Sequence, residues 1–195
     1  MRALPAVHRR RAARHGDRAQ ALRRRGRALT ELTGEIVRLT PLAPEHAAAL
    51  RAIRSDPAVE EFWDPLEPDF PLEDEPESTR FTIHHDGEVA GMVQSWEETE
   101  PKYRHAGIDI FVSPAHQGRG VCTEAIRLLV RHLIDDRGHH RLVIDPAAHN
   151  AAAVGCYTKA GFTPVGVMRL AERASDGRSW HDALMMELVV EPQPR

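Results

Sequence analysis

The sequence predicts one mixed α/β domain, in which a mostly antiparallel sheet contains a central parallel strand pair and is flanked by helices. The order of apolar segments is the first indication, because it runs hairpin, strand, helix, strand, helix, strand, strand. The second is segment 120–137, whose apolar residues recur every three or four positions, as on one face of an α-helix. The third is Asp86-Gly87, a strong hairpin turn between two alternating segments.

Before residue 120 the sequence predicts short strands and two short helices. Strands are expected where apolar and polar residues alternate, and both helices begin near a proline, which suits a first helical turn. In chain order we expect a strand at 36–40, a helix at 45–54, a second helix from 57 to about 63, strands at 79–84 and 89–96, a loop at 97–106, and a strand at 108–112.

Beyond the long helix the pattern continues with strand, helix, strand and strand. A long helical connection makes the next strand parallel to 108–112. Asn150 is a good N-cap and Gly161 suits the position after a helix end. The expected elements are a strand at 141–145, a helix from Asn150 to Ala160, and strands at 164–172 and 181–190 around a turn at Ser175-Asp176-Gly177.

The charge of the chain is segregated. Residues 1–30 contain ten Arg and one acid, a net charge of +9, so the remainder carries −12 although the whole chain is at −3. An acidic body argues against binding of nucleic acid or an anionic membrane by the folded part, and leaves nucleic acid open as a partner of the basic stretch alone. We expect residues 1–34 to be an extension, whether a helix, a disordered arm or an over-long translation start, and 35–195 to be the domain.

Several classes of protein are excluded. The chain has no run of eighteen apolar residues, so a membrane-spanning helix is excluded, and its Arg-rich start lacks the apolar stretch of a secretory signal. Cys122 and Cys156 are too few for a disulfide framework and fall in predicted helices, so buried thiols are expected. No His, Cys and carboxylate set has metal-site spacing. We expect a cytoplasmic monomer or homodimer without a metal.

The turn between strand 108–112 and the long helix is the most informative stretch. Gly118 and Gly120 would let several backbone N–H groups point in one direction at a helix N-terminus, an arrangement that favours a phosphate or pyrophosphate. Arg119 adds a cation inside the same turn. By itself the glycine pair is weak evidence, because turns also use glycine for steric reasons alone.

Two motifs together resemble one family. Gln117-Gly118-Arg119-Gly120-Val121-Cys122 resembles the Gln/Arg-x-x-Gly-x-Gly/Ala acetyl-coenzyme A (acetyl-CoA) signature of the GNAT acetyltransferase superfamily. Asn150 and segment 156–162, Cys-Tyr-Thr-Lys-Ala-Gly-Phe, resemble its Asn…(Cys/Phe)-Tyr-x-Lys-x-Gly-Phe segment, and the resemblance covers about 36–191. Cys122 departs from the pattern, because the family usually has Gly or Ala there. Its small side chain should still permit the backbone to approach a ligand.

Shorter matches narrow the resemblance to the aminoglycoside 6′-N-acetyltransferases. Related acyltransferases that act on lysine or siderophore amines share some of them. The matching segments are Gln94-Ser95-Trp96, the acidic segment 97–101, Gly107-Ile108-Asp109, Asp145-Pro146 with Asn150, and Trp180-His181-Asp182.

The resemblance implies acetyl-CoA as co-substrate, bound along strand 108–112 and the glycine turn. A splay of this strand would admit the pantetheine arm, and the strand residues would act through their main chain. The implied cofactor-binding residues are Ile110, Phe111, Val112, Gln117, Gly118, Arg119, Gly120, Val121, Cys122, Thr123 and Asn150.

Two residues are candidates for catalysis. Tyr157 can protonate the departing thiolate, since a phenol with a pKa of about 10 keeps its proton at neutral pH; without the motif, a core tyrosine would be the expected reading. Asp109 interrupts an apolar strand and can receive or hold the substrate ammonium, directly or through water, because a buried carboxylate needs a partner. An internal salt bridge with Arg104 or His105 is the alternative for Asp109.

Acidic loops flank the expected acceptor site. Residues 60–77 contain nine carboxylates and no basic residue, and 97–100 contain three more. Aminoglycosides are polycations, which an acidic pocket attracts, and aromatic residues among the acids can stack on cationic groups. The candidate substrate-binding residues are Trp63, Asp64, Trp96, Glu97, Glu98 and Asp145; ordinary solvated loops, and for Asp145 a turn, are the alternatives.

These observations lead to one expected function and two alternatives. We expect direct acetyl transfer from acetyl-CoA to an amine of a polycationic small molecule, foremost the 6′-amine of an aminoglycoside. The first alternative keeps the chemistry and changes the acceptor to a peptide, polyamine or siderophore-type lysine amine. The second is a non-catalytic protein that binds coenzyme A or a cationic ligand.

Overall fold

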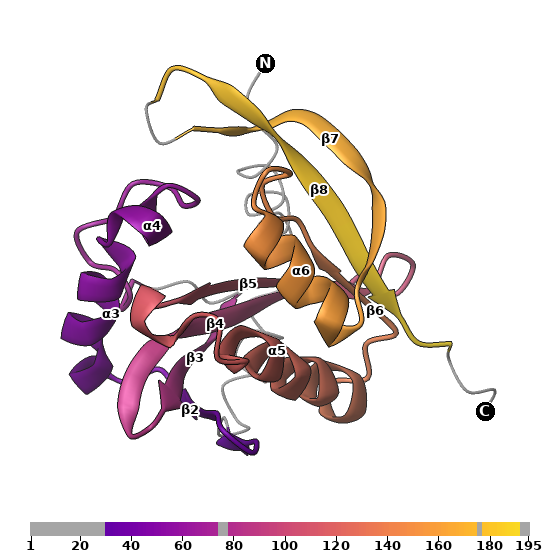
Figure 1. The fold of residues 1–195 in the computed structure, drawn as a ribbon. Helices are drawn as coiled ribbons and strands as arrows, with labels where there is room; N and C mark the ends of the chain where they lie inside the picture. The colour runs from indigo at the N-terminus through magenta and orange to yellow at the C-terminus, as the bar shows by residue number, and fades with distance from the viewer. Residues whose placement is uncertain (1–29, 74–77, 175–176, 192–195) are drawn as a thin grey trace.

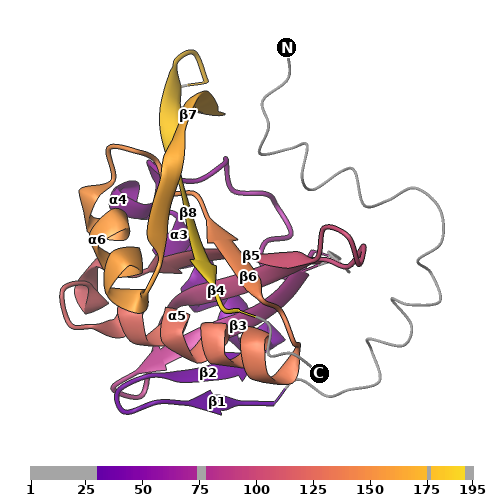
Figure 2. The ribbon, with the colours of Figure 1, turned by 90° about the vertical axis from the view of Figure 1, so that its right-hand side faces the viewer.

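The computed structural model describes residues 30–73, 78–174 and 177–191. In these residues eight strands form one sheet in the order β1-β2-β3-β4-β5-β6-β8-β7 (Figures 1 and 2). The strands are β1 (Leu32–Thr33), β2 (Arg38–Pro41), β3 (Ser78–His85), β4 (Glu88–Glu98), β5 (His105–Val112), β6 (Arg141–Ile144), β7 (Thr163–Arg173) and β8 (Trp180–Val189). The helices are η1 (Pro44–His46), α3 (Ala47–Arg54), α4 (Pro57–Glu60), η2 (Pro114–His116), α5 (Val121–Arg131), η3 (His132–Asp136) and α6 (Ala151–Ala160).

The sheet is antiparallel except at its centre, where β5 and β6 are parallel. The mixed fold with a central parallel pair is therefore confirmed. The pairing of β5 with β6 joins only Ala106 to Leu142 and Gly107 to Val143, although β5 continues to Val112. Beyond β6 the chain turns to β8, where the Ala148 N–H donates to the Asp182 carbonyl at 2.8 Å. The second half of β5 is thus left beside an opening in the sheet.

Hydrophobic side chains alternate between the two faces of the sheet, as the two-residue period of a strand requires. On one face Val93 and Ile110 pack in the main core with α5 and Tyr157 of α6. On the other face Met92 and Phe111 form a second core with Leu50 of α3. Figure 1 shows the helices accordingly in two pairs, α3 with α4 and α5 with α6. Asp109 lies two residues from Phe111, and so on the α3 side of β5.

The long helix begins at a glycine with positive φ and ends in a π-helical turn. Gly120 is its N-cap with φ 85°, and Gly118 has φ 71°, a region that residues with a Cβ rarely adopt. The expected helix 120–137 is divided into α5 and the π-helical turn η3. No helix among the described residues has the length and apolar character that crossing a membrane requires.

Several expected elements differ in detail from the structure. The loop expected at 97–106 is shorter, because β4 extends to Glu98 and β5 begins at His105. The strand expected at 36–40 begins at Arg38, and Leu32–Thr33 forms β1 inside the expected extension. Of the turn expected at 175–177 only Gly177 is described, and most of the extension, residues 1–29, lies outside the described residues as well.

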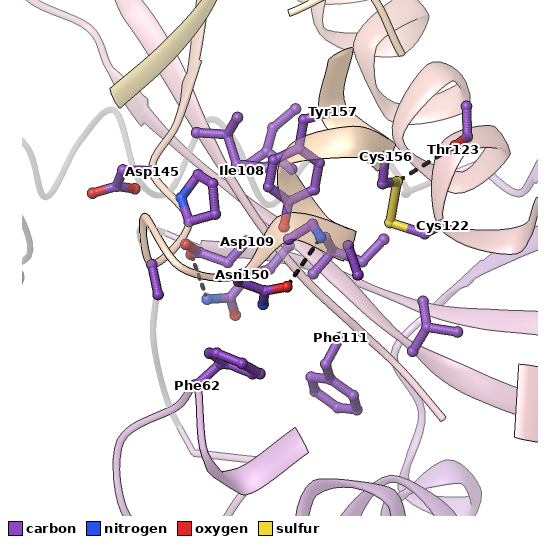
Figure 3. Close-up of a pocket in the computed structure, with 18 of the residues that line it drawn as sticks. Phe62, Ile108, Asp109, Phe111, Cys122, Thr123, Asp145, Asn150, Cys156 and Tyr157 are labelled. Atoms are coloured by element: carbon purple, nitrogen blue, oxygen red, sulfur yellow. Dashed lines mark hydrogen bonds between the residues drawn. A yellow bond between two sulfur atoms is a disulfide. The ribbon is translucent and has the colours of Figure 1, made fainter. Parts of the chain in front are cut away.

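The expectation of buried thiols was wrong. Cys122 at the start of α5 and Cys156 in α6 are joined as a disulfide (Figure 3). The two helices pack side by side, and the Cα atoms of the two residues are 6.5 Å apart, within the range that a disulfide spans. Two isolated cysteines in different helices carry no sequence signal for this pairing.

Candidate active site

One large pocket opens beside the second half of β5. Its volume is about 1990 Å³, roughly twice the upper end of drug-sized pockets. It extends from Trp63 and Asp64 after α4, past Asp109 and Phe111, to the N-terminus of α5 and along α6 to Lys159. A pocket of this length and size can hold two substrates end to end.

The glycine turn forms one end of the pocket. Gln117, Gly118, Gly120, Val121, Cys122 and Thr123 all line it. The Gln117 side chain donates to the Val112 carbonyl at 3.0 Å, which joins the turn to the end of β5. A Cβ on Gly118 would have no heavy atom within 4 Å, so the space above this residue is open. Free N–H groups at the start of α5 therefore face room for an anion.

Arg119 is directed away from this turn. Its guanidinium donates to Asp86 of the β3–β4 turn at 2.7 Å, and both side chains are exposed. Arg119 is not among the residues that line the pocket. The Arg119 cation that we expected inside the turn therefore pairs with Asp86 instead. The partial positive charge at the turn comes from backbone N–H groups at the start of α5.

The strand opening and α6 form the middle of the pocket. Ile110, Phe111 and Val112 line it from β5, as expected for a main-chain binding strand. Asn150 is the N-cap of α6, where its side chain accepts from the Ala153 N–H at 3.0 Å. Asn150 also lines the pocket, so the predicted N-cap is confirmed and the residue stands at the site (Figure 3).

Tyr157 points its hydroxyl into the pocket, on the side of Asp109 and Asn150 (Figure 3). The residue is buried. Burial raises the pKa of Tyr157 well above its usual range, and the charges of Asp109, Asp145 and Glu172 raise it further. A phenol in this setting keeps its proton at every working pH, and can therefore serve as a hydrogen-bond donor to a developing anion.

Asp109 is held by a polar chain that crosses three strands of the sheet. Its carboxylate accepts from the Gln94 side chain at 2.9 Å, and Gln94 in turn accepts from Arg80 at 3.1 Å. Arg80 also pairs with Glu73 at 2.8 Å. The Arg104 and His105 side chains bond instead to the carbonyls of Arg137 and Tyr103. The Asp109 carboxylate is thus positioned toward the pocket by Gln94.

Two arginines of α3 hold the acidic loop that follows α4. Arg51 donates to the carbonyls of Glu67, Pro68 and Phe70, and Arg54 donates to the carbonyl of Asp64. The Arg54 guanidinium also lies 5.2 Å from the centre of the Trp63 ring. These contacts place the loop rather than leave it as a free solvated segment. Asp74, Glu75 and Glu77 lie outside the described residues.

Each of the two candidate tryptophans packs one edge or face of its ring against another ring of the protein. Trp63 packs edge-on against Phe111, with ring centres 5.3 Å apart, and Trp96 packs against His105 at 5.2 Å. Both line the pocket, as do Asp64, Glu98 and Asp145. Asp64 and Asp145 are exposed at the pocket wall, whereas the Glu98 carboxylate accepts from the Glu100 N–H at 2.8 Å.

Glu97 also lines the pocket, and its carboxylate is engaged by two basic side chains of the protein. Its carboxylate pairs with Arg137 at 2.8 Å and with the buried His139 at 2.7 Å, and its side chain is only 9% exposed. Burial acts to raise the pKa of Glu97, but the hydrogen bonds and charges of His139 and Arg137 outweigh it and lower the pKa to about 2. The charge of Glu97 is therefore compensated inside the protein by Arg137 and His139, and a contact of Glu97 with the substrate stays a prediction.

A family model described as the acetyltransferase (GNAT) family matches residues 46–162, which is more than half of the chain. The chain belongs to the GNAT acetyltransferase family. As a member of that family it is an acetyl-CoA-dependent N-acetyltransferase.

Curated relatives act on different amines. Over 139 residues the chain is 28% identical to spermidine N(1)-acetyltransferase of Escherichia coli, with 67% of this chain and 74% of that enzyme covered. Over 94 residues it is 36% identical to aminoglycoside N(6′)-acetyltransferase type 1 of Klebsiella pneumoniae, with 42% of this chain and 46% of that enzyme covered. A structure of AAC(6′)-Ib with paromomycin and acetyl-CoA has a TM-score of 0.61 and 26% identity, over 80% of this chain and 94% of that one.

The residues of this acetyltransferase fit acetyl-CoA as co-substrate. The turn at Gly118 and Gly120 has open space and N–H donors, which suit a pyrophosphate. Beyond the turn, the pocket includes Arg127 and Lys159, where Arg127 donates to the Lys159 carbonyl. These two cations were not predicted as site residues, because charged residues on a helix surface usually face solvent. Among the described residues no cluster could hold a metal ion.

The acetyltransferase pocket also contains a residue pair that the sequence did not indicate. Glu172 of β7 and His181 of β8 are directly opposite in the hairpin, and their side chains are 3.4 Å apart. Both line the pocket. The hairpin brings them there from outside both sequence motifs. Motif-based reasoning therefore missed them, although His181 lies in a segment matched to the aminoglycoside subgroup.

Proposed function

We propose that the chain transfers the acetyl group of acetyl-CoA to an amine of a polycationic small molecule, foremost the 6′-amine of an aminoglycoside. The observation that carries this proposal is the group of carboxylates that line the pocket. Asp64, Asp109, Asp145 and Glu172 line it and act electrostatically on one another or on Tyr157. Several negative charges around one cavity favour a ligand with several ammonium groups.

The pocket supports a direct transfer between two bound substrates. Acetyl-CoA supplies the acetyl group as a thioester, held at the glycine turn and the open half of β5. Asp109, oriented by Gln94, would hold the acceptor ammonium from the α3 side of the sheet. Tyr157 would donate its proton to the leaving thiolate, and main-chain N–H groups of β5 would polarise the carbonyl. Trp63 and Trp96 offer aromatic surface to the rest of the acceptor.

The test is a product assay with defined amines. Kanamycin incubated with the full chain and acetyl-CoA should gain one acetyl group by mass spectrometry, and fragmentation should locate it on the 6′-amine. Absence of an acetylated product across several aminoglycosides would overturn the substrate claim and leave the chemistry intact.

A polyamine is the second candidate acceptor. The sequence match to a spermidine acetyltransferase covers 67% of this chain, against 42% for the aminoglycoside acetyltransferase of Klebsiella pneumoniae. Spermidine carries several ammonium groups that the carboxylates of the pocket can attract. It has no sugar ring that could stack on Trp63 or Trp96. Comparing kcat/KM for spermidine, a lysine peptide and kanamycin distinguishes the classes, and a preference for the lysine peptide by tenfold or more would contradict the polycation proposal.

Replacing Tyr157 with Phe tests whether the pocket is catalytic. The hydroxyl is lost while the buried ring is kept, so kcat should fall about 100-fold or more and the midpoint of thermal unfolding should stay close to the wild-type value. The matched control is Tyr103→Phe, because Tyr103 is 63% exposed and lies outside the pocket. Equal activity of Tyr157→Phe and the wild type would remove Tyr157 from the mechanism.

A further inference from the structure

Tyr157 would serve only one half of the reaction, the departure of the thiolate. An acceptor amine with a lysine-like pKa of about 10 reaches the site as an ammonium, and must lose a proton before it can attack. A group that accepts this proton must stand near Tyr157, because the amine attacks the same carbonyl whose sulfur Tyr157 protonates. It must also be partly ionised near neutral pH.

Glu172 of β7 is the candidate for this group. It lines the pocket, and its charge raises the pKa of Tyr157 together with those of Asp109 and Asp145. The cross-strand neighbour His181 lies 3.4 Å from its carboxylate. The Glu172 side chain is 25% exposed, so a proton taken up inside the pocket has a path to water.

The strand that carries Glu172 is irregular just before this residue. The β7–β8 pairing shifts register between Met168 and Glu172, and Leu170 has φ 48°, which is uncommon for a residue with a side chain. Asp182 of β8 secures this conformation, because its carboxylate accepts from the Leu170 N–H at 2.7 Å. Bulges of this kind redirect side chains and are frequent beside active sites. Here the irregular strand brings both Ala171 and Glu172 to the pocket wall.

We propose that Glu172 is the proton acceptor for the substrate ammonium, across the β7–β8 hairpin from His181. This inference rests on the proposed function of the pocket as the site of N-acetylation. An N–H bond of the ammonium breaks and an O–H bond forms on Glu172, while the electron pair stays on nitrogen for the attack. Of the three ammonium protons one remains on the amide, one replaces the proton that Tyr157 gives to the thiolate, and one leaves through Glu172.

The electrostatic setting of Glu172 suits this role. Burial raises the pKa of Glu172, and the charges of Asp145, Asp64 and Asp109 raise it further, to about 7. Glu172 interacts electrostatically with these three carboxylates and with Tyr157 of α6, and His181 of β8 lies beside it. A carboxyl group with this pKa is half ionised at neutral pH and is a stronger base than an ordinary glutamate.

The test compares pH profiles of kcat/KM, which report the ionisations of the free enzyme. Wild-type activity should rise with pH through about 7 as Glu172 loses its proton. Glu172→Gln should lower kcat/KM about 100-fold or more and remove this acid limb, while Glu172→Asp should keep the limb with part of the activity. The matched control is Glu187→Gln in the same hairpin, because Glu187 pairs with Arg141 outside the pocket, and it should keep the wild-type profile.

A second measurement needs no substrate. Carboxyl carbon NMR of the ligand-free protein should show one group that titrates near pH 7 in the wild type and is missing in Glu172→Gln. Titration of Glu172 near its ordinary value, or a wild-type acid limb in Glu172→Gln, would overturn the inference. If no amine is acetylated the proposed function fails, and the NMR titration still decides whether Glu172 is suited to accept a proton.

Discussion

At the scale of single residues, the close approach of the Trp96 ring to β5 requires a glycine at position 107. Gly107 lies directly opposite Trp96 in the sheet, and a Cβ on Gly107 would lie 2.1 Å from the Trp96 ring. The ring cannot simply retreat, since it is packed against His105. Gly107 therefore leaves room for the Trp96 ring against β5, at the last residue of β5 that pairs with β6.

Gly107→Ala should destabilise the protein through this contact. The added methyl forces Trp96 or β5 to shift, which costs about 1–3 kcal/mol of unfolding free energy. Urea denaturation followed by circular dichroism measures the difference. Gly155→Ala is the control, because a Cβ there meets nothing within 4 Å and Gly155 lies inside α6, where Ala is preferred by about 1 kcal/mol. A Gly107→Ala protein as stable as the wild type would show that the indole repacks freely.

The site residues that could be predicted are those marked by residues close to them in the sequence. Asn150 and Gly161 could be predicted because an N-cap and the residue after a helix act within a few positions of the chain. Tyr157 and the glycine turn follow from contiguous motifs. The partners of Glu97 could not be predicted, because Arg137 and His139 approach it from about forty positions away in the sequence. Glu172 was missed for a similar reason, since an irregular strand rather than a motif brings it to the pocket.

At the scale of elements, two long-range links hold the site together. Glu97 at the end of β4 binds Arg137 after η3 and His139 before β6, so it connects both sides of the parallel pair. The disulfide connects the start of α5 to the middle of α6. The first link fixes the outer end of β5 and β6, and the second fixes the two helices that border the opening.

The Glu97 link predicts a specific loss of stability in acid. Its folded-state pKa of about 2 lies below the ordinary 4.5, so its contribution is complete above pH 4.5 and is lost as pH falls through 2. This difference in pKa corresponds to at most about 3 kcal/mol of unfolding free energy, a value that screening by solvent reduces. Urea denaturation at several pH values should show this loss in the wild type and not in Glu97→Gln, which is less stable at neutral pH. A Glu97→Gln protein of normal stability but with a tenfold higher KM for the amine would assign Glu97 to the substrate site.

The disulfide predicts a response to reductant. Cys122 and Cys156 are 34 positions apart, a loop whose closure restricts the unfolded chain by about 4 kcal/mol in the chain-entropy model. Protein isolated without reductant should therefore unfold at a lower temperature after reduction. The double variant Cys122→Ser, Cys156→Ser should unfold at the same temperature with and without reductant. An unchanged wild-type unfolding temperature on reduction would contradict the cross-link.

At the scale of the whole molecule, charge is distributed along the chain in two opposite blocks. The basic block falls almost entirely on residues 1–29, and the sheet begins after it, at Leu32. Leu32 packs against the main core, and Glu124 of α5 accepts from the N–H of Ile36 at 3.0 Å. The described residues therefore include a strand before the boundary expected at residue 35, and residues 30–195 together carry a net charge of −12.

Two truncations separate the charge of the basic block from the structure of the domain. Deletion of residues 1–29 should leave acetylation intact, and kcat/KM for a polycationic amine should fall more steeply with salt than in the full chain, because the net charge changes from −3 to −12. Deletion of residues 1–34 also removes β1 and should lower the unfolding temperature. Steady-state kinetics from low to physiological salt measure the first effect. A truncation at residue 29 that abolishes activity, or an equal salt dependence in both proteins, would show that the basic block acts at the site and is not a separable extension.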